Sequence, residues 1–106
     1  MPKLIFTESA QADVLQAWLY IAEVNLTAAD GVLEAIERDA TVLLRQPLMG
    51  RARPELGRQV RSWPTSTPYI LYYISEKAGI TVLRVLHHAR DVRVAWFENQ
   101  LTGYMP

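Results

Sequence analysis

The segment from Pro47 to Leu56 separates two halves of this chain that differ in hydrophobic period. Before this segment, apolar side chains recur at spacings of three and four residues, which is the period of an amphipathic helix. After it, apolar side chains form the short runs and alternations that are typical of strands. A helical half followed by a strand half predicts an α+β fold. The 106 residues are the usual length of one domain, which we expect to span residues 1–106.

Caps and turn residues predict the individual elements. Ser9 is expected to cap a first helix that ends near Asn25. Asn25 or Thr27 is expected to cap a second helix that ends at Pro47. The other expected elements are strands over Lys3–Thr7, Arg58–Trp63, Tyr69–Ser75 and Ile80–Leu86 and a helix over Ala89–Gln100, with Tyr69–Ser75 at the centre because it is apolar on both faces. They predict an N-terminal strand, an antiparallel helix hairpin packed on an antiparallel β-sheet, and a short C-terminal helix.

Charge is distributed unevenly along the chain, although the formal total is zero. Residues 1–44 carry two basic and seven acidic side chains, whereas residues 45–61 carry five arginines and only one acid. One interpretation is a contact surface for an acidic partner, with Arg51, Arg53, Glu55, Arg58 and Arg61 as its candidate residues. The other is internal pairing of Arg53 and Arg61 with Glu55 and with helix acids such as Glu34 or Asp39. An exposed pair contributes less than about 1 kcal/mol, so stability alone is a weak reason to gather five arginines.

Composition excludes several classes of site. The chain has no cysteine, which excludes disulfides, thiolate zinc sites and cysteine nucleophiles, and two adjacent histidines do not make a metal site by themselves. We therefore expect no metal and no cofactor. A pI near 6.7 argues against a broad positive surface for direct, sequence-specific binding of nucleic acid. The absence of a long apolar run or a signal-like N-terminus predicts a soluble cytoplasmic protein that does not enter membranes.

An ordered series of short motifs resembles the ParE branch of the bacterial ParE/RelE toxin superfamily, the toxic halves of toxin–antitoxin pairs. The resemblance covers nearly the whole chain. Its motifs are Phe6-Thr7 followed by a helix, Trp18 to Ala22 in that helix, Pro47 to Leu56, Val60-Arg61-Ser62, Tyr69 to Tyr73, and Leu83 to Asp91. The resemblance implies a toxin that inhibits DNA gyrase by protein–protein contact and is not an enzyme. It also implies a cognate ParD-like antitoxin, bound in a hetero-oligomer as an extended and helical segment along the toxin.

The sibling RelE branch cleaves messenger RNA on the ribosome, which is the main alternative. That chemistry needs a general base, a general acid and cations around the phosphate, for which Arg61, Arg84, His87 and His88 are the candidates. Strand alternation places Val82 and Arg84 on one face and His87 on the other, so Arg84 and His87 share no pocket unless a bulge intervenes. A third reading is a binding module derived from the fold that is no longer toxic.

The C-terminal segment is a second candidate surface. Trp96, Phe97 and Tyr104 bring three aromatic side chains to a domain that already has two helices to cover its sheet. Aromatic side chains that their own chain does not bury usually mark a partner surface. Trp96 and Phe97 are therefore predicted to contact gyrase or the antitoxin. Arg90 is placed with the partner-binding residues, although Arg90-Asp91 also marks the expected start of the last helix.

Overall fold

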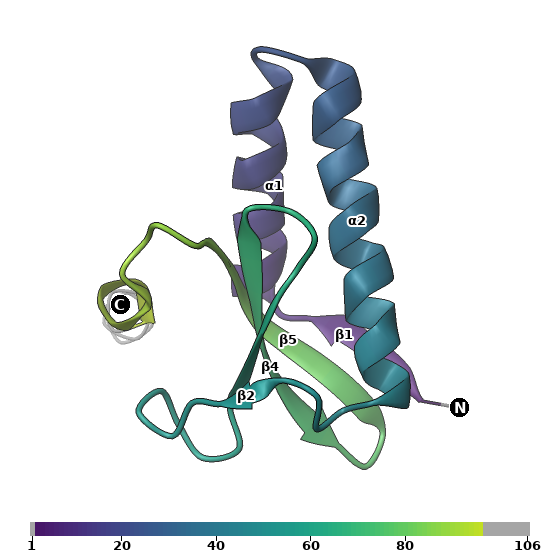
Figure 1. Ribbon diagram of the computed structural model, residues 1–106, viewed down its shortest axis with the longest axis vertical. Coiled ribbons are helices and arrows are strands. Elements are labelled where there is room, and N and C mark those ends of the chain that lie inside the picture. The colour runs from purple at the N-terminus through teal and green to yellow at the C-terminus, as the bar shows by residue number, and fades with distance from the viewer. Residues whose placement is uncertain (1, 97–106) are drawn as a thin grey trace.

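The computed structural model describes residues 2–96 and consists of a helix hairpin set against one twisted sheet (Figure 1). The elements in chain order are β1 (Lys3–Phe6), α1 (Glu8–Ala22), α2 (Leu26–Arg45), β2 (Arg51–Ala52), β3 (Arg61–Pro64), β4 (Tyr69–Glu76) and β5 (Gly79–His87). Residues 92–96 form a further helical turn, so the last helix begins at Val92 rather than at the expected Ala89, and its expected part beyond Trp96 lies outside the described residues. The predicted α+β class and element order are confirmed, and the two-residue strand β2 is an addition that the sequence pattern did not predict.

The sheet has the strand order β1-β5-β4-β3-β2, with β4 at its centre as predicted. The pairs formed by β2, β3, β4 and β5 are antiparallel, but β1 runs parallel to β5. The sheet is therefore mixed, whereas an antiparallel sheet was expected. Alternation within a strand reports which faces are buried and carries no information about the direction of its neighbour.

Caps define both helices of the hairpin. The side chain of Thr7 accepts a hydrogen bond from the Ala10 N–H at 3.1 Å, so Thr7 caps α1 and the prediction of Ser9 is wrong. Thr7 has extended backbone angles, as an N-cap requires, and its hydroxyl also donates to the Leu83 carbonyl at 3.0 Å. A contact with a strand 76 residues away thus selects this cap. Asn25, one of the two predicted alternatives, caps α2 through the Ala28 N–H.

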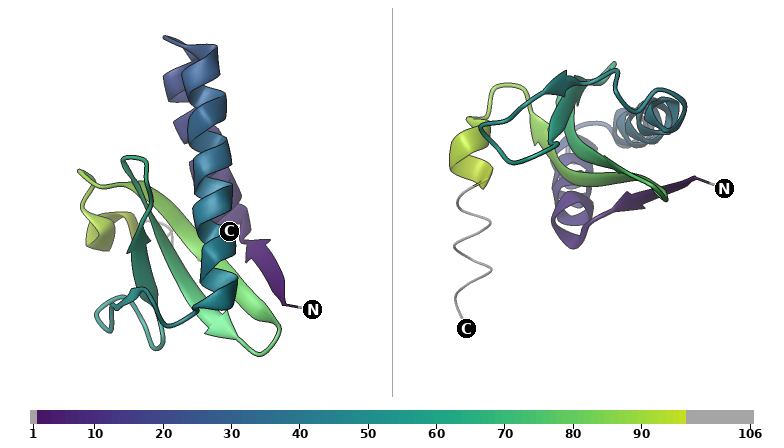
Figure 2. Two further views of the ribbon diagram at one scale, coloured as in Figure 1. Left: turned by 45° about the vertical axis from the view of Figure 1, so that its right-hand side comes forward. Right: turned by 90° about the horizontal axis from the view of Figure 1, so that it is seen from below.

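Each face of the sheet packs on its own apolar cluster. The α1–α2 face holds the cluster that contains Tyr73, Leu71, Val82 and Ile36, and the opposite face holds the cluster that contains Tyr72. Leu56 and Val60 from the connection before β3, together with Ala95, cover this second face. The views in Figure 2 show the hairpin and the C-terminal turn against different parts of the sheet. Burial of β4 on both sides explains why its sequence is apolar at successive positions.

A β-bulge at Leu83 corrects the predicted alternation of β5. Tyr72 pairs with Arg84 and Tyr73 pairs with Val82, so Leu83 has no opposite residue. Val82 therefore lies on the helix side with Tyr73, whereas Arg84 lies with Tyr72, and the prediction that Val82 and Arg84 share a face is wrong. The pattern of apolar residues could not reveal this shift because Val82 and Leu83 are both apolar.

The strand predicted from Arg58 begins later, at Arg61, because residues 57–60 form a tight turn. Val60 donates its N–H to the Gly57 carbonyl at 3.3 Å. Gly57 and Gln59 both have positive φ angles, of 150° and 68°. Such angles are incompatible with a strand and strained for a residue other than glycine. Arg58 is therefore presented on a turn rather than on a strand.

Candidate functional site

A buried tyrosine fixes the connection that carries most of the arginines. The Tyr73 hydroxyl donates to the Pro47 carbonyl at 2.8 Å and accepts the Gly50 N–H at 2.9 Å. Burial raises the pKa of this hydroxyl above its ordinary value, which keeps it protonated and able to donate. A Cβ at residue 50 would collide with the Tyr73 ring and the Ser62 carbonyl, so this close approach requires glycine. The connection from α2 to β3 is thereby anchored to the central strand.

Replacement of Tyr73 by phenylalanine is expected to lower the free energy of unfolding by about 1–3 kcal/mol, because it leaves the buried Gly50 N–H and the half-buried Pro47 carbonyl without this hydrogen-bond partner. Urea denaturation followed by circular dichroism measures this change. The matched control is Tyr20→Phe, whose side chain is 75% exposed. The control should change stability by less than about 0.5 kcal/mol. Equal effects of the two variants would contradict the anchoring role of Tyr73.

Arg61 on β3 is held by the same connection. Its guanidinium donates to the Gly50 carbonyl at 2.7 Å and to the Leu48 carbonyl at 3.4 Å. The predicted alternative of pairing with a helix acid is not what the structure shows for Arg61. Asp39 instead accepts hydrogen bonds from the main chain and hydroxyl of Ser66, at 2.7 and 2.9 Å. Arg61 is half-buried, and its guanidinium is hydrogen-bonded to main-chain carbonyls rather than to an acid.

Arg53 pairs with Glu55, as the internal-pairing alternative predicted. The two side chains meet at 2.9 Å, and the Arg53 guanidinium also lies 5.7 Å from the centre of the Tyr72 ring, within the range of a cation–π contact. A further hydrogen bond at 3.4 Å joins Arg53 to the Ser62 hydroxyl. The hydrogen bond from Arg53 holds the pKa of the exposed Glu55 carboxyl below its usual value. Arg53 and Glu55 therefore form an ordered pair at the surface beside the sheet.

Arg51 and Arg58 differ from Arg53 and Arg61 because no hydrogen bond fixes their side chains, although the charge of Arg51 adds to the effect of Arg53 in lowering the pKa of Glu55. Both side chains are exposed, and neither makes a hydrogen bond or ion pair with any residue between 2 and 96. Arg51 lies on the edge strand β2, and Arg58 lies at the tip of the 57–60 turn. We call the three residues Arg51, Arg53 and Arg58 the arginine surface. Arg61 lies apart from it, because Arg61 pairs with Tyr73, whereas Arg51 pairs with Ser62 and Arg53 contacts Tyr72 on the opposite face of the sheet. The arginine surface combines the anchored guanidinium group of Arg53 with those of Arg51 and Arg58, which face solvent.

The four candidate nuclease residues do not converge. Arg61 pairs with Tyr73 in the sheet register and His87 pairs with Tyr69. These positions are four residues apart along β4, which corresponds to about 13 Å. Arg84 pairs with Tyr72 and so lies on the face opposite to His87, since the bulge at Leu83 precedes both. The depression lined by His87 does not include Arg61.

Arg84 instead belongs to a buried ion pair that links three parts of the chain. Its guanidinium donates to both Asp13 carboxylate oxygens, at 2.7 and 2.9 Å, and to the Ala95 carbonyl at 3.1 Å. Asp13 also accepts the Val85 N–H at 3.0 Å. Asp13 was not among the candidate residues that the sequence indicated. The signal that could have corrected this omission is its spacing from Ala10 and Ala17, which places Asp13 on the buried side of α1.

His87, His88 and Arg90 lie together at the end of β5, away from the arginine surface. The two imidazole rings stack at 4.5 Å, and Tyr69 contacts His87 edge-on at 5.4 Å. Nδ1 of His87 accepts the Ala89 N–H at 3.1 Å, so this nitrogen is already occupied. Arg90 and His87 line a depression of about 130 Å³ with Tyr69 and Gln16. The depression is small and shallow.

Trp96 is only half exposed because it packs on the second apolar cluster. Its ring contacts Tyr72 edge-on, with 5.9 Å between the ring centres. The described chain therefore covers part of this side chain, which weakens the argument that its aromatic surface must be covered by a partner. The other predicted contact, Phe97, lies outside the described residues, as does the aromatic residue Tyr104.

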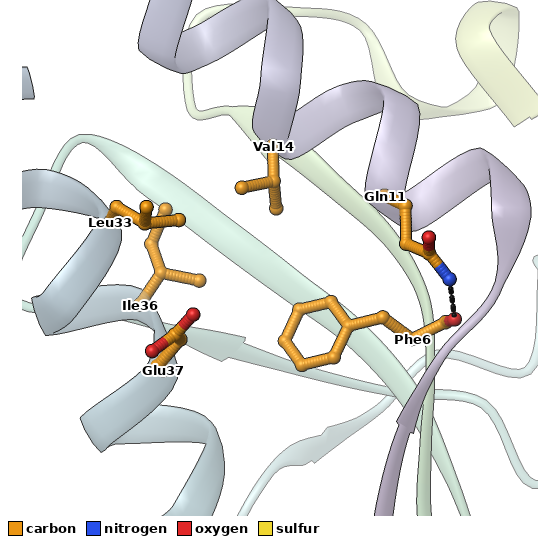
Figure 3. A pocket seen from close by; sticks show the side chains of 6 residues that line it. All are labelled: Phe6, Gln11, Val14, Leu33, Ile36 and Glu37. Carbon is orange, nitrogen blue, oxygen red and sulfur yellow. Dashed lines mark hydrogen bonds between the residues drawn. The ribbon is translucent and has the colours of Figure 1, made fainter. Parts of the chain in front are cut away.

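A larger apolar cleft opens between the helix hairpin and β1 (Figure 3). Its volume is about 300 Å³, and its lining consists mainly of Phe6, Val14, Leu33 and Ile36. Gln11 and Glu37 provide the polar part of the lining, and the Gln11 amide donates to the Phe6 carbonyl at 2.8 Å. The sequence did not predict this cleft. Its walls come from three elements, and the apolar residues of each element have the spacing expected of ordinary core residues.

Residues 2–96 contain no cluster of three or more side chains that could hold a metal ion. In the same part of the chain, no helix is long and apolar enough to cross a membrane.

Comparison with known proteins gives one family and one fold. The family model described as the ParE toxin of the type II toxin–antitoxin system parDE matches residues 4–92. Among solved structures, the chain is similar to one described as the chromosomal ParDE toxin–antitoxin system from P. aeruginosa, with a TM-score of 0.68 and 21% sequence identity. This likeness covers 82% of the present chain and 96% of the other. A search of curated proteins finds no match.

Proposed function

Because the chain belongs to the ParE toxin family of type II toxin–antitoxin systems, we propose that it inhibits DNA gyrase by protein–protein contact and that a ParD-like antitoxin neutralises it. The antitoxin is supported by the similar solved structure, which is described as a ParDE system. A toxin of this kind acts by binding, so the proposal needs a surface rather than a catalytic centre.

The observation that carries the proposal is the exposure of Arg51 and Arg58 without a hydrogen bond or ion pair to the described residues. Guanidinium groups that are not used internally add little to stability but are well suited to recognise carboxylates on a partner. Arg53 is anchored by Glu55 on the same face as Arg51, which limits the conformational entropy lost on binding. The arginine surface thus fits an acidic partner.

We prefer a mechanism by protein–protein contact to one by RNA cleavage, because the candidate residues for RNA cleavage lie apart from one another. Arg84 is committed to Asp13, and Arg61 is committed to main-chain carbonyls. General acid–base catalysis requires its groups within hydrogen-bond reach of one substrate position. These four candidates do not meet that condition in this structure, which supports a toxin that is not an enzyme.

The test is a DNA supercoiling reaction with purified gyrase, run with and without the protein, beside a cell-free translation reaction. Loss of supercoiling with intact translation is the expected result. Cleaved messenger with intact supercoiling would reverse the assignment in favour of the RelE-type activity. No effect on either reaction would contradict the proposed target and favour a binding module without toxicity.

A further inference from the structure

Both main-chain polar groups of Gly50 are held by side chains of the sheet. The Arg61 guanidinium donates to the Gly50 carbonyl at 2.7 Å, and the Tyr73 hydroxyl accepts the Gly50 N–H at 2.9 Å. Arg61 and Tyr73 are paired across β3 and β4, so their side chains lie on the same face of the sheet. We call these two residues the clamp, because together they hold the main chain at Gly50 from one face.

The clamp acts immediately before the shortest strand of the sheet. β2 consists of Arg51 and Ala52, which pair with Ser62 and Arg61. It is also an edge strand, so it has only β3 as a neighbour in the sheet. A two-residue strand with one neighbour has few main-chain hydrogen bonds of its own and is marginally stable. The place of Arg51 therefore depends on the residues that precede β2.

The clamp also ties down the turn that leads into β2. The Arg61 guanidinium reaches the Leu48 carbonyl at 3.4 Å, and the Tyr73 hydroxyl donates to the Pro47 carbonyl at 2.8 Å. Hydrogen bonds from a charged donor are stronger than those between neutral groups. The chain from Pro47 to Gly50 is thus fixed to β3 and β4 at several points before it enters β2.

Arg51 projects from the face of the sheet opposite to the clamp. Arg51 pairs with Ser62, the neighbour of Arg61 on β3, and side chains alternate between the faces along a strand. Arg53, two residues further on, contacts Tyr72 on the same side as Arg51. A partner that meets the arginine surface therefore does not meet Arg61. The sequence predicted Arg61 as a contact residue, whereas the structure places it behind the strand that carries Arg51.

We propose that Arg61 is a positioning residue of the arginine surface, which together with Tyr73 holds the main chain of Gly50 so that Arg51 is presented to the acidic partner in one place. This inference rests on the part of the proposed function that makes the arginine surface the contact with an acidic partner, and it does not depend on which protein that partner is. Without the clamp, binding would have to order residues 50–52, and the conformational entropy lost would weaken the affinity.

A fluorescent oligoglutamate peptide is the probe, because it presents carboxylates to the arginine surface without gyrase or an antitoxin. Fluorescence anisotropy measures its affinity for the full chain. Arg61→Met and Tyr73→Phe should each weaken peptide binding by about five- to tenfold, since one or two residues would have to be ordered on binding. Tyr73→Phe changes no charge, so its effect cannot arise from long-range attraction. Arg61→Lys keeps the charge and a donor for the Gly50 carbonyl, and should recover the affinity to within about threefold.

Dependence on Arg51 separates positioning from a general loss of structure. In the Arg51→Ala background, Arg61→Met should change the peptide affinity by less than about twofold, because the side chain that it positions is gone. Ile80→Val is the control for lowered stability, since Ile80 is buried and both β4 and β3 lie between its strand and β2. Lys77→Met is the control for the loss of one exposed positive charge. Neither control should change the affinity by more than about twofold, and circular dichroism checks that each variant is folded.

Hydrogen exchange gives a readout that needs no ligand. The N–H groups of Gly50 and Arg53 are bonded to the Tyr73 hydroxyl and to the Val60 carbonyl. Arg61→Met should speed exchange at these two amides and leave the ladder between β4 and β5 unchanged, because only the local structure around β2 is loosened.

Three outcomes would overturn the inference. The first is a peptide affinity that neither Arg61→Met nor Tyr73→Phe changes. The second is an equal effect of Arg61→Met with and without Arg51, and the third is a loss with Lys77→Met as large as that with Arg61→Met. Failure of the gyrase proposal looks different. A native chain that leaves supercoiling intact but binds the peptide in a clamp-dependent way would remove gyrase as the target and support the positioning role.

Discussion

Replacement of Asp13 by asparagine is expected to lower the free energy of unfolding by about 3–5 kcal/mol, which is the cost of breaking a buried ion pair. Arg84 is only 8% exposed, so the substitution leaves a charge inside the protein without its counter-ion. Asparagine keeps the shape of the side chain and one acceptor oxygen, which confines the change mainly to charge. Chemical denaturation measures the loss.

Replacing Asp13 and Arg84 together should cost less stability than replacing Asp13 alone. The double variant Asp13→Leu with Arg84→Met removes both charges and should recover most of the stability that Asp13→Asn loses, since well-packed apolar pairs often match buried ion pairs. The Val85 N–H and the Ala95 carbonyl would each lose a partner, so recovery should be incomplete. The control is Glu34→Ala, an exposed acid on α2, with an expected change of less than about 0.5 kcal/mol. A small effect of Asp13→Asn would show that Arg84 finds solvent or another acceptor.

Hydrogen exchange extends this prediction to the C-terminal turn. Arg84 bonds the Ala95 carbonyl directly, so the loss of its ion pair should loosen residues 92–96 more than the distant β3. Uniform loss of protection over the whole chain would instead indicate that the pair acts only on global stability.

Reversal of charge at Arg51 and Arg58 is the second prediction with a large expected effect. The double variant Arg51→Glu, Arg58→Glu should weaken binding to the acidic partner of the arginine surface, whether that is the proposed gyrase target or the antitoxin. The expected loss is about 100-fold or more, equivalent to about 2.7 kcal/mol, because like charges would face each other across the contact. Thermal stability should hardly change, since neither side chain makes a hydrogen bond or ion pair with residues 2–96. Inhibition of supercoiling and calorimetric titration with the antitoxin measure the two possible partners separately.

A matched control separates local recognition from net charge. Lys3→Glu with Lys77→Glu changes the total charge by the same amount at two other exposed positions. This control should slow association slightly and leave the affinity within about threefold, as expected for screened charges far from a contact. Equal effects of the two double variants would refute a specific arginine surface and leave only long-range attraction.

The sequence alone determined the fold class, the helix hairpin and the central position of β4. These features depend on hydrophobic period and on caps, which are local: Asn25 begins α2 and the doubly apolar run from Tyr69 marks the strand that is buried on both faces. The unusual number of arginines after Pro47 was also visible, because charge can be counted without a structure. The family followed from the ordered motifs and is confirmed by the match to residues 4–92.

Tertiary structure decided what each charged residue does. The sequence could not distinguish the committed Arg61 from the exposed Arg58, because that difference depends on the carbonyls of Gly50 and Leu48 and on a turn with positive φ angles. It could not pair Asp13 with Arg84, which are 71 residues apart and meet only after the bulge at Leu83 sets the register of β5. Hydrophobic period reports burial one residue at a time, whereas ion pairs and exposed surfaces depend on which distant segments meet.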